Sequence, residues 1–263
     1  MNEFYKLYLP KSKREVRIEI SIPKYRNHIS FDTLYFLDGQ NAFSDTRATF
    51  GRSIRATKHL NFAAKEMGKR IIGVAIHNSG TDMGRVNEYS PFKIDFFTDK
   101  WRNNDVTECF NFCDDLVNTI VPFIESKYDV RPNPENRYIY GSSLAAVTAI
   151  YTAFKYPNSF NYVGAFSTAS FLFEEAFYKF LTKNINHDKK VFLYCGKEET
   201  SDQMTLNSIY EDSTFKLYNF FKENNIKTRV VISTSGEHNE ETWDKNFLDF
   251  INFVYYDDVI FKK

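Results

Sequence analysis

The regular alternation of short apolar runs with longer amphipathic segments limits the fold more than any other feature of this sequence. Short apolar runs predict buried strands, and apolar residues at helical spacing predict helices. Strands that alternate with helices form a mostly parallel sheet with helices on both faces. We expect strands at 33–37, 70–76, 136–140, 161–166, 190–195 and 227–233, and helices at 53–67, 108–128, 144–154, 170–182, 204–224 and 240–254.

The N-terminal segment has a different pattern. Residues 4–10 and 15–22 alternate between polar and apolar side chains, and the basic stretch 11–14 lies between them, which predicts an antiparallel hairpin. The twisted sheet would then have about eight strands. Neither a Gly/Ser-rich linker nor a repeat divides the chain, so we expect one α/β domain over 1–263, without a large lid domain.

Composition excludes several classes of function. Lys and Arg together number 34, as do Asp and Glu, and this balance predicts no nucleic acid and no membrane partner. No apolar run approaches the roughly 20 residues that cross a bilayer, and the N-terminus lacks a secretory pattern, so a cytoplasmic location is expected. Three cysteines without a metal-ligand pattern predict neither a disulfide framework nor a metal site, and the serine chemistry derived below requires no cofactor.

A candidate nucleophile lies between a predicted strand and a predicted helix. Loops that follow parallel strands meet at one edge of the sheet, where ligands bind. The turn Gly141-Ser142-Ser143-Leu144-Ala145 has the form of a nucleophile elbow, with Ser143 at its centre and alanine where a second glycine is usual. The alternative is that Ser142 and Ser143 only cap the following helix.

A serine nucleophile needs a base, and the base needs an acid that orients it. In α/β-hydrolases the order along the chain is serine, acid, histidine. His238 follows the last predicted strand and is the candidate base, with His77 as the runner-up. Glu198 and Glu199 follow the strand at 190–195, and either one satisfies the order. Two solvated loop carboxylates are the alternative interpretation.

Acyl transfer also needs N–H donors for the oxyanion of the tetrahedral intermediate. The backbone N–H of Leu144, directly after the nucleophile, is one candidate. The other is expected in the loop after an early strand, where Gly39 permits a sharp turn and Gln40 or Asn41 offers its N–H. An ordinary Asp-Gly turn is compatible with that role.

Five segments carry a family resemblance: 38–43, 85–91, 141–145, 196–199 and 236–243. In this order and spacing they resemble the esterase family that includes esterase D, feruloyl and acetyl-xylan esterases, and siderophore esterases related to enterochelin esterase. The resemblance implies an α/β-hydrolase fold and a triad of Ser143, His238 and Glu199, because the family acid stands three positions after a glycine. The sequence departs from the family at that acid, which is commonly Asp, and at Ala145 and Ala146, which are commonly glycines.

The expected activity is serine esterase chemistry through an acyl-enzyme, on a small-molecule ester with a short-chain, aromatic or sugar acyl group. An acyltransferase, or a siderophore or thioester hydrolase with the same triad, is the nearest alternative. A catalytically inactive binding protein is the alternative from another class, and Ala145 and Ala146 are its only support.

Three aromatic residues are expected to contact the substrate. Trp243 lies in the segment after His238, Trp101 in the aromatic stretch 92–104, and Tyr89 in the family-like segment 85–91. For Trp243 a structural role on a helix is an equal alternative. The aromatic content of 17% is also compatible with a homo-oligomer, although the sequence does not specify one.

Overall fold

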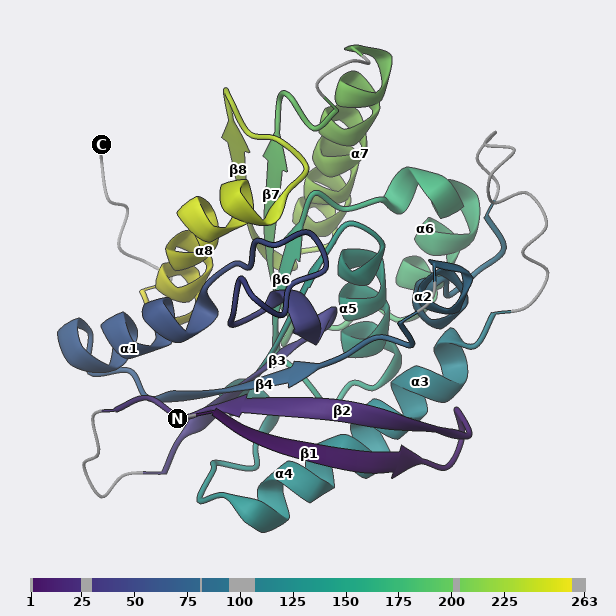
Figure 1. The fold of residues 1–263 in the computed structure, drawn as a ribbon. Helices are drawn as coiled ribbons and strands as arrows, with labels where there is room; N and C mark the ends of the chain where they lie inside the picture. Colours follow the sequence, from purple (N-terminus) through teal and green to yellow (C-terminus); the bar gives the residue numbers. More distant parts are fainter. Residues whose placement is uncertain (1, 25–29, 81, 95–106, 201–203, 257–263) are drawn as a thin grey trace.

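The structure, a computed structural model, describes residues 2–24, 30–80, 82–94, 107–200 and 204–256. Within these residues the strands form one sheet of eight strands in the order β1-β2-β4-β3-β5-β6-β7-β8 (Figure 1). The strands are β1 (Asn2–Leu9), β2 (Arg14–Ser21), β3 (Asp32–Phe36), β4 (Ile71–Ile76), β5 (Arg137–Ser142), β6 (Tyr162–Phe166), β7 (Lys190–Gly196) and β8 (Lys227–Ser233).

The predicted N-terminal hairpin is confirmed. Strands β1 and β2 pair antiparallel with Leu9 opposite Arg14, and β2 pairs antiparallel with β4. Every other pairing in the sheet is parallel. The buried Asp115 accepts hydrogen bonds from the backbone N–H groups of Lys11 and Ser12, at 3.1 and 2.7 Å, and so fixes the hairpin turn to the helices beneath it.

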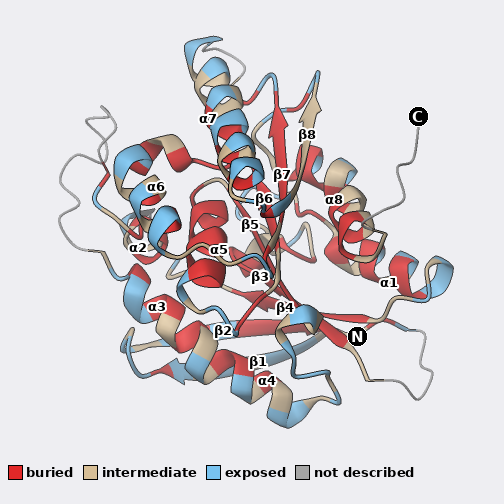
Figure 2. Ribbon diagram, turned by 180° about the vertical axis from the view of Figure 1, so that it is seen from behind, coloured by how far each residue is buried: buried red, intermediate tan, exposed pale blue. Residues whose placement is uncertain are grey.

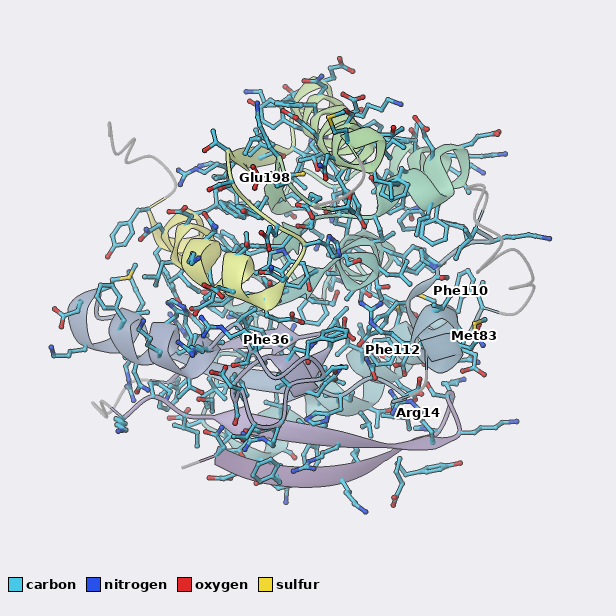
Figure 3. The ribbon with its side chains drawn as sticks, turned by 45° about the horizontal axis from the view of Figure 1, so that its top comes forward. Arg14, Phe36, Met83, Phe110, Phe112 and Glu198 are labelled. Atoms are coloured by element: carbon cyan, nitrogen blue, oxygen red, sulfur yellow. The ribbon has the colours of Figure 1, made fainter. Side chains whose placement is uncertain are left out.

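Helices cover both faces of the sheet, as expected, and two apolar clusters fill the space between sheet and helices (Figures 1 and 2). Phe36 lies in the cluster under α1 and α8, and Phe112 lies in the other cluster; both residues are labelled in Figure 3. The helices are α1 (Ala56–Glu66), α2 (Asp82–Tyr89), α3 (Cys109–Asp115), α4 (Val121–Lys127), α5 (Leu144–Lys155), α6 (Glu174–Lys183), α7 (Met204–Glu223) and α8 (Glu240–Tyr255).

Two features differ in detail from the expected helices. The helix expected at 108–128 contains a π-helical turn, η2 (Leu116–Ile120), between α3 and α4. Helix α2 was not expected, because Gly84 stands in its middle and the segment has no continuous apolar stripe. The sheet itself follows the predicted strands closely, since each buried strand is a short apolar run.

The direction of the strands defines where a site can form. Because β3, β5, β6, β7 and β8 run parallel, the segments that follow them lie at one edge of the sheet. These segments begin with the single-turn helix η1 (Gly39–Asn41) after β3 and end with the loop 234–239 after β8. None of the helices in the described part of the chain is both long and apolar enough to span a bilayer.

Candidate active site

Ser143 occupies a strained turn between β5 and α5. Its φ of 59° and ψ of −126° lie outside the regions that L-residues favour, so the surrounding structure must hold it there. Its backbone N–H donates to the carbonyl oxygen of Phe166 at 2.8 Å. A Cβ at position 141 would lie 2.3 Å from the carbonyl oxygen of Ala145, so only glycine fits there. This geometry is the predicted strand-to-helix elbow, and it leaves the N–H of Leu144 in the first helical turn.

His238 is joined to Glu199 by two hydrogen bonds. The Nδ1 atom of His238 lies 2.6 Å from Oε2 of Glu199, and its backbone N–H donates to the Glu199 carbonyl oxygen at 3.2 Å. Glu199 is 3% exposed, whereas Glu198 is exposed on the same loop after β7 (Figure 3). Of the two acids that the sequence leaves open, Glu199 is therefore the one that contacts the histidine.

A buried chain of polar groups holds Glu199 in place. The Oε1 atom of Glu199 accepts hydrogen bonds from Ser167 Oγ at 2.6 Å and from the Gly196 N–H at 2.7 Å. The indole Nε1–H of Trp243 donates to Ser167 Oγ at 2.9 Å. The indole ring also meets the His238 ring edge-on, with centroids 5.2 Å apart. Both oxygens of the Glu199 carboxylate are thus hydrogen-bonded, which fixes its orientation.

Ser167 is a site residue that was not predicted from the sequence. It directly follows β6, at the same edge of the sheet as the other site residues, and is fully buried with a φ of 48°. Its position after a strand was the available signal, since the residues after the other parallel strands were considered for that reason. Its contact with Trp243 could not be predicted from the sequence, because Trp243 lies 76 positions further along the chain.

The loop after β3 turns sharply toward Ser143. Asp38 has a φ of 52°, and the N–H of Asn41 donates to the Asp38 carbonyl oxygen at 2.9 Å. A Cβ on Gly39 would lie 2.3 Å from the backbone nitrogen of Ile76, so glycine is required. The side chain of Asn41 is fixed by a bond of 2.7 Å to Glu240 Oε1. Gln40 and Asn41 were the two expected N–H donors for the oxyanion. The N–H of Asn41 is already bonded within the turn, to the Asp38 carbonyl oxygen.

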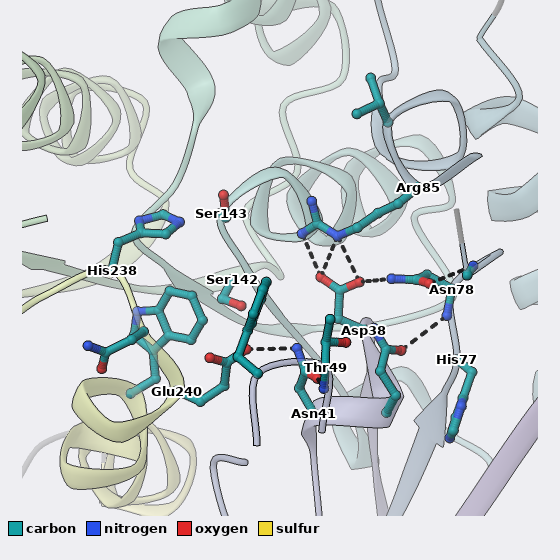
Figure 4. Close-up of a pocket in the computed structure, with 16 residues that line it drawn as sticks. Asp38, Asn41, Thr49, His77, Asn78, Arg85, Ser142, Ser143, His238 and Glu240 are labelled. Atoms are coloured by element: carbon teal, nitrogen blue, oxygen red, sulfur yellow. Dashed lines mark hydrogen bonds and ion pairs between the residues drawn. The ribbon is translucent and has the colours of Figure 1, made fainter. Parts of the chain in front are cut away.

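An ion pair between the buried Asp38 and the partly exposed Arg85 supports this loop (Figure 4). Arg85 donates from Nε to both carboxylate oxygens of Asp38, at 2.9 and 3.0 Å, and from Nη2 at 2.6 Å. Asn78 Nδ2 adds a bond of 2.7 Å. Bidentate pairing of this kind fixes orientation as well as supplying energy, so the loop is held at the sheet edge by residues from α2 and from the end of β4.

Tyr89 differs from its expected role in substrate contact. It is fully buried, and its hydroxyl accepts the Asp38 N–H at 3.0 Å. A side chain with no exposed surface cannot touch a substrate, so its place is behind the loop. Trp243 does line the pocket described below, and Trp101 lies outside the described residues.

A pocket of about 660 Å³ lies in front of these residues, and Figure 4 shows Ser143 and His238 on one side and Arg85 on the other. It is large enough for a drug-sized ligand. Burial raises the pKa of Glu240, and burial lowers the pKa of His77 to about 4, with Arg17 and Arg47 adding to that effect. The lining residues are Asp38, Gln40, Asn41, Thr49, Phe50, His77, Asn78, Gly80, Arg85, Val86, Ser142, Ser143, His238, Asn239, Glu240 and Trp243.

The pocket thus gathers Ser143, His238 and Gln40 around one space. In the described residues no hydrogen bond joins Ser143 to His238, whose Nδ1 is bonded to Glu199. Catalytic hydrogen bonds are often long in unliganded enzymes and shorten when substrate binds. No group of three or more His, Cys, Asp or Glu side chains in the described part of the chain has the arrangement of a metal site.

Comparison with protein families identifies the fold and the class. The model of the family described as putative esterase matches residues 10–253. The chain belongs to the putative esterase family. This membership makes the protein a carboxylic ester hydrolase, and it confirms the family that the five motif segments resemble.

Three individual proteins illustrate the similarity. The curated YbbA protein of Bacillus subtilis (strain 168) is 22% identical over 175 residues, which are 65% of this chain and 69% of that protein. An IroE-like serine hydrolase from Shewanella oneidensis superposes with a TM-score of 0.78 at 16% identity, over 99% of this chain and 82% of the other. The siderophore hydrolase EstA from Aspergillus nidulans gives 0.75 at 14% identity, over 96% and 95%. At such low identity the two structures show the common α/β-hydrolase fold.

Proposed function

We propose that this esterase uses Ser143 as its nucleophile, His238 as its general base and acid, and Glu199 as the group that orients the imidazole. The observation that carries the proposal is the bond of 2.6 Å between His238 Nδ1 and the buried Glu199. This bond leaves Nε2 of His238 free to accept a proton, and both His238 and Ser143 line the same pocket. A strained serine at a helix N-terminus is the typical position of a hydrolase nucleophile.

The reaction proceeds in two steps. His238 takes the proton of Ser143, Oγ bonds to the ester carbonyl carbon, and the alcohol leaves with the proton that His238 returns. Water then gives a proton to His238 and bonds to the same carbon. The bond from Oγ to that carbon breaks, and Ser143 recovers its proton. Glu199 stays ionised throughout and stabilises the imidazolium that forms in each step.

The oxyanion is assigned to the backbone N–H groups of Leu144 and Gln40. Leu144 supports this assignment by its place at the start of α5, where helical N–H groups lack intrahelical partners. Gln40 is favoured over Asn41 because the Asn41 N–H already donates to Asp38. Losing one such donor typically reduces turnover about 100- to 1000-fold.

The pocket favours a small ester that carries polar groups. Opposite Ser143 its wall offers the Asp38–Arg85 pair and the amide of Asn78, and the exposed ring of Phe50 also lines it. Short polar side chains beside an aromatic surface suit hydroxylated acyl or alcohol groups, so sugar acyl and hydroxylated aromatic esters are preferred over long aliphatic ones. A panel of such esters, compared by kcat/KM with p-nitrophenyl butyrate, tests this preference.

The nucleophile is tested with a fluorophosphonate probe and with p-nitrophenyl acetate. Wild-type protein is expected to be labelled and to hydrolyse the ester, and Ser143→Ala to lose both while retaining its circular dichroism spectrum. Ser53→Ala is the matched control, because it changes the other Gly-x-Ser sequence, which lies away from the pocket. If the Ser143→Ala protein is still labelled, another serine is the nucleophile. If the wild-type protein is not labelled, an inactive binding protein is favoured.

An added acceptor alcohol separates hydrolysis from acyl transfer. If water is the acceptor, free acid is the only acyl product, whereas an acyltransferase also forms the new ester. Mass spectrometry of the products distinguishes the two.

A further inference from the structure

Glu240 is a buried carboxylate in the wall of the pocket, and the proposed mechanism gives it no role. It is the first residue of α8, directly after the helix cap Asn239, and it is 6% exposed. Its Oε1 atom accepts the hydrogen bond of 2.7 Å from Asn41 Nδ2 that Figure 4 shows as a dashed line. Ser143 and His238 line the same pocket, so a substrate held at the nucleophile lies in the space that Glu240 borders.

The hydrogen-bond partner of Glu240 is uncharged. Within the described part of the chain, Glu240 forms no ion pair with a lysine, arginine or histidine side chain. The amide of Asn41 is held in place by its own oxygen, which accepts the Thr49 N–H at 2.8 Å, so its N–H group points to Glu240. Burial raises the pKa of Glu240, and the positive charge of Arg85 opposes this effect only in part.

The other ionisable groups that line the pocket contribute no net charge. Asp38 and Arg85 cancel each other, because Arg85 is bonded to both carboxylate oxygens of Asp38. His77 is neutral at pH 7, since burial lowers its pKa to about 4. His238 acts as a base only in its neutral form. Among the described residues of the pocket wall, Glu240 therefore supplies a negative charge that no other group balances.

We propose that Glu240 is a specificity-determining residue, which makes the pocket select esters that carry an ammonium group over uncharged and anionic esters of the same shape. This inference rests on the proposed esterase function and adds the charge of the substrate to it. A cation in the pocket displaces water from the carboxylate, and the attraction is then stronger than in bulk water. An anionic substrate meets repulsion instead, and Arg85 offsets little of it because its charge is paired with Asp38.

Aryl acetates of matched shape measure this preference. The m-(trimethylammonio)phenyl ester is cationic, the m-tert-butylphenyl ester is its uncharged isostere, and the m-carboxyphenyl ester is anionic. Because the acetyl group is small, the aryl part fills the pocket and brings its substituent toward Glu240. Wild-type protein is expected to give the highest kcat/KM with the cationic ester and the lowest with the anionic one.

Two substitutions separate the charge of Glu240 from its shape. Glu240→Gln keeps an oxygen that can accept from Asn41 but removes the charge. The ratio of kcat/KM for the cationic ester to that for the uncharged ester is expected to fall about 10-fold, the size expected for a partly screened charge pair. Glu240→Asp keeps the charge and should retain the preference.

Glu241→Gln is the matched control. It removes the same charge from the same end of α8, but Glu241 is exposed, pairs with Lys245 at 3.0 Å and does not line the pocket. The ratio should therefore stay as in the wild-type protein. If Glu240 only holds Asn41 in place, Glu240→Gln lowers kcat/KM for all the esters alike and leaves their ratios unchanged, which would overturn the proposal.

Binding of the aryl products distinguishes this inference from the proposed function. Isothermal titration calorimetry with m-(trimethylammonio)phenol and with m-tert-butylphenol needs no reaction. Wild-type protein is expected to bind the cationic phenol more tightly, and Glu240→Gln to lose about 10-fold of that preference. If the wild-type protein shows this preference but is not labelled by the fluorophosphonate probe, the proposed mechanism fails and the charge preference stands. Equal affinities for the two phenols in the wild-type protein would overturn the charge preference, whatever the activity.

Discussion

His238 and Glu199 are linked through both side chain and backbone: Nδ1 lies 2.6 Å from Oε2, and the His238 N–H donates to the Glu199 carbonyl oxygen at 3.2 Å. The second bond ties the loop after β8 to the loop after β7, so the distance between the proposed base and the proposed acid does not depend on side-chain rotamers alone. A histidine held at Nδ1 presents Nε2 to its other partner. The predictions below follow from this link and from the groups that support it.

Replacing the acid tests the link directly. Glu199→Gln keeps the shape of the side chain but removes the charge that orients and stabilises the imidazolium. We expect kcat for p-nitrophenyl acetate to fall about 1000- to 10,000-fold, as in other serine hydrolases with a neutralised acid. Glu198→Gln is the matched control, and since Glu198 is exposed it should retain activity within about twofold. Similar losses in both variants would contradict the assignment.

Removing the hydroxyl of Ser167 tests the support of the acid. Ser167→Ala deprives Glu199 Oε1 of one donor and leaves the indole N–H of Trp243 without its acceptor. The free energy of unfolding, measured with urea, should fall by about 1.5–3 kcal/mol, and kcat should decrease as well. Ser170→Ala is the control, because the Ser170 hydroxyl is buried without a partner. A stable and fully active Ser167→Ala protein would exclude this role.

The loop after β3, which carries the proposed oxyanion donor Gln40, depends on the buried hydroxyl of Tyr89. Tyr89→Phe removes the acceptor of the Asp38 N–H and should destabilise the protein by about 1–3 kcal/mol. Because the loop then loses an anchor, we expect kcat to fall about tenfold with KM little changed. Tyr35→Phe, which removes a buried hydroxyl without a partner, should leave kcat unchanged. A change in KM alone would instead indicate direct substrate contact by Tyr89.

His77 should make stability depend on pH. Burial lowers its pKa from the usual 6.5 to about 4 in the folded protein, so the unfolded chain binds more protons between these values. The stabilisation is present above pH 6.5 and is lost as the pH falls toward 4, by about 2–3 kcal/mol. In His77→Gln that loss should disappear from urea-unfolding curves recorded between pH 4 and 7. Equal pH slopes in both proteins would mean that His77 is charged when folded.

The fold could be predicted well because its signals are local. Each buried strand of the parallel sheet is an apolar run, and the helices between them have a 3.6-residue apolar period. Helix α2 was missed because packing against α3 and α5 stabilises it rather than its own pattern. Spacing alone left Glu198 and Glu199 open, since both lie in one loop after β7. The family resemblance favoured Glu199, and the coordinates show that Glu199 is the one that contacts His238.

The sequence by itself determined the strand and helix order, the sharp turns at Gly39 and Gly141, and the placement of Ser143, Glu199 and His238 after parallel strands. Only the tertiary structure decided which side chains meet at that edge. The contacts of Ser167 with Trp243 and of Asp38 with Arg85 join residues that are 76 and 47 positions apart. Local propensities fix the direction of a strand or helix, but contacts over such separations arise from sheet order and packing, to which the whole chain contributes.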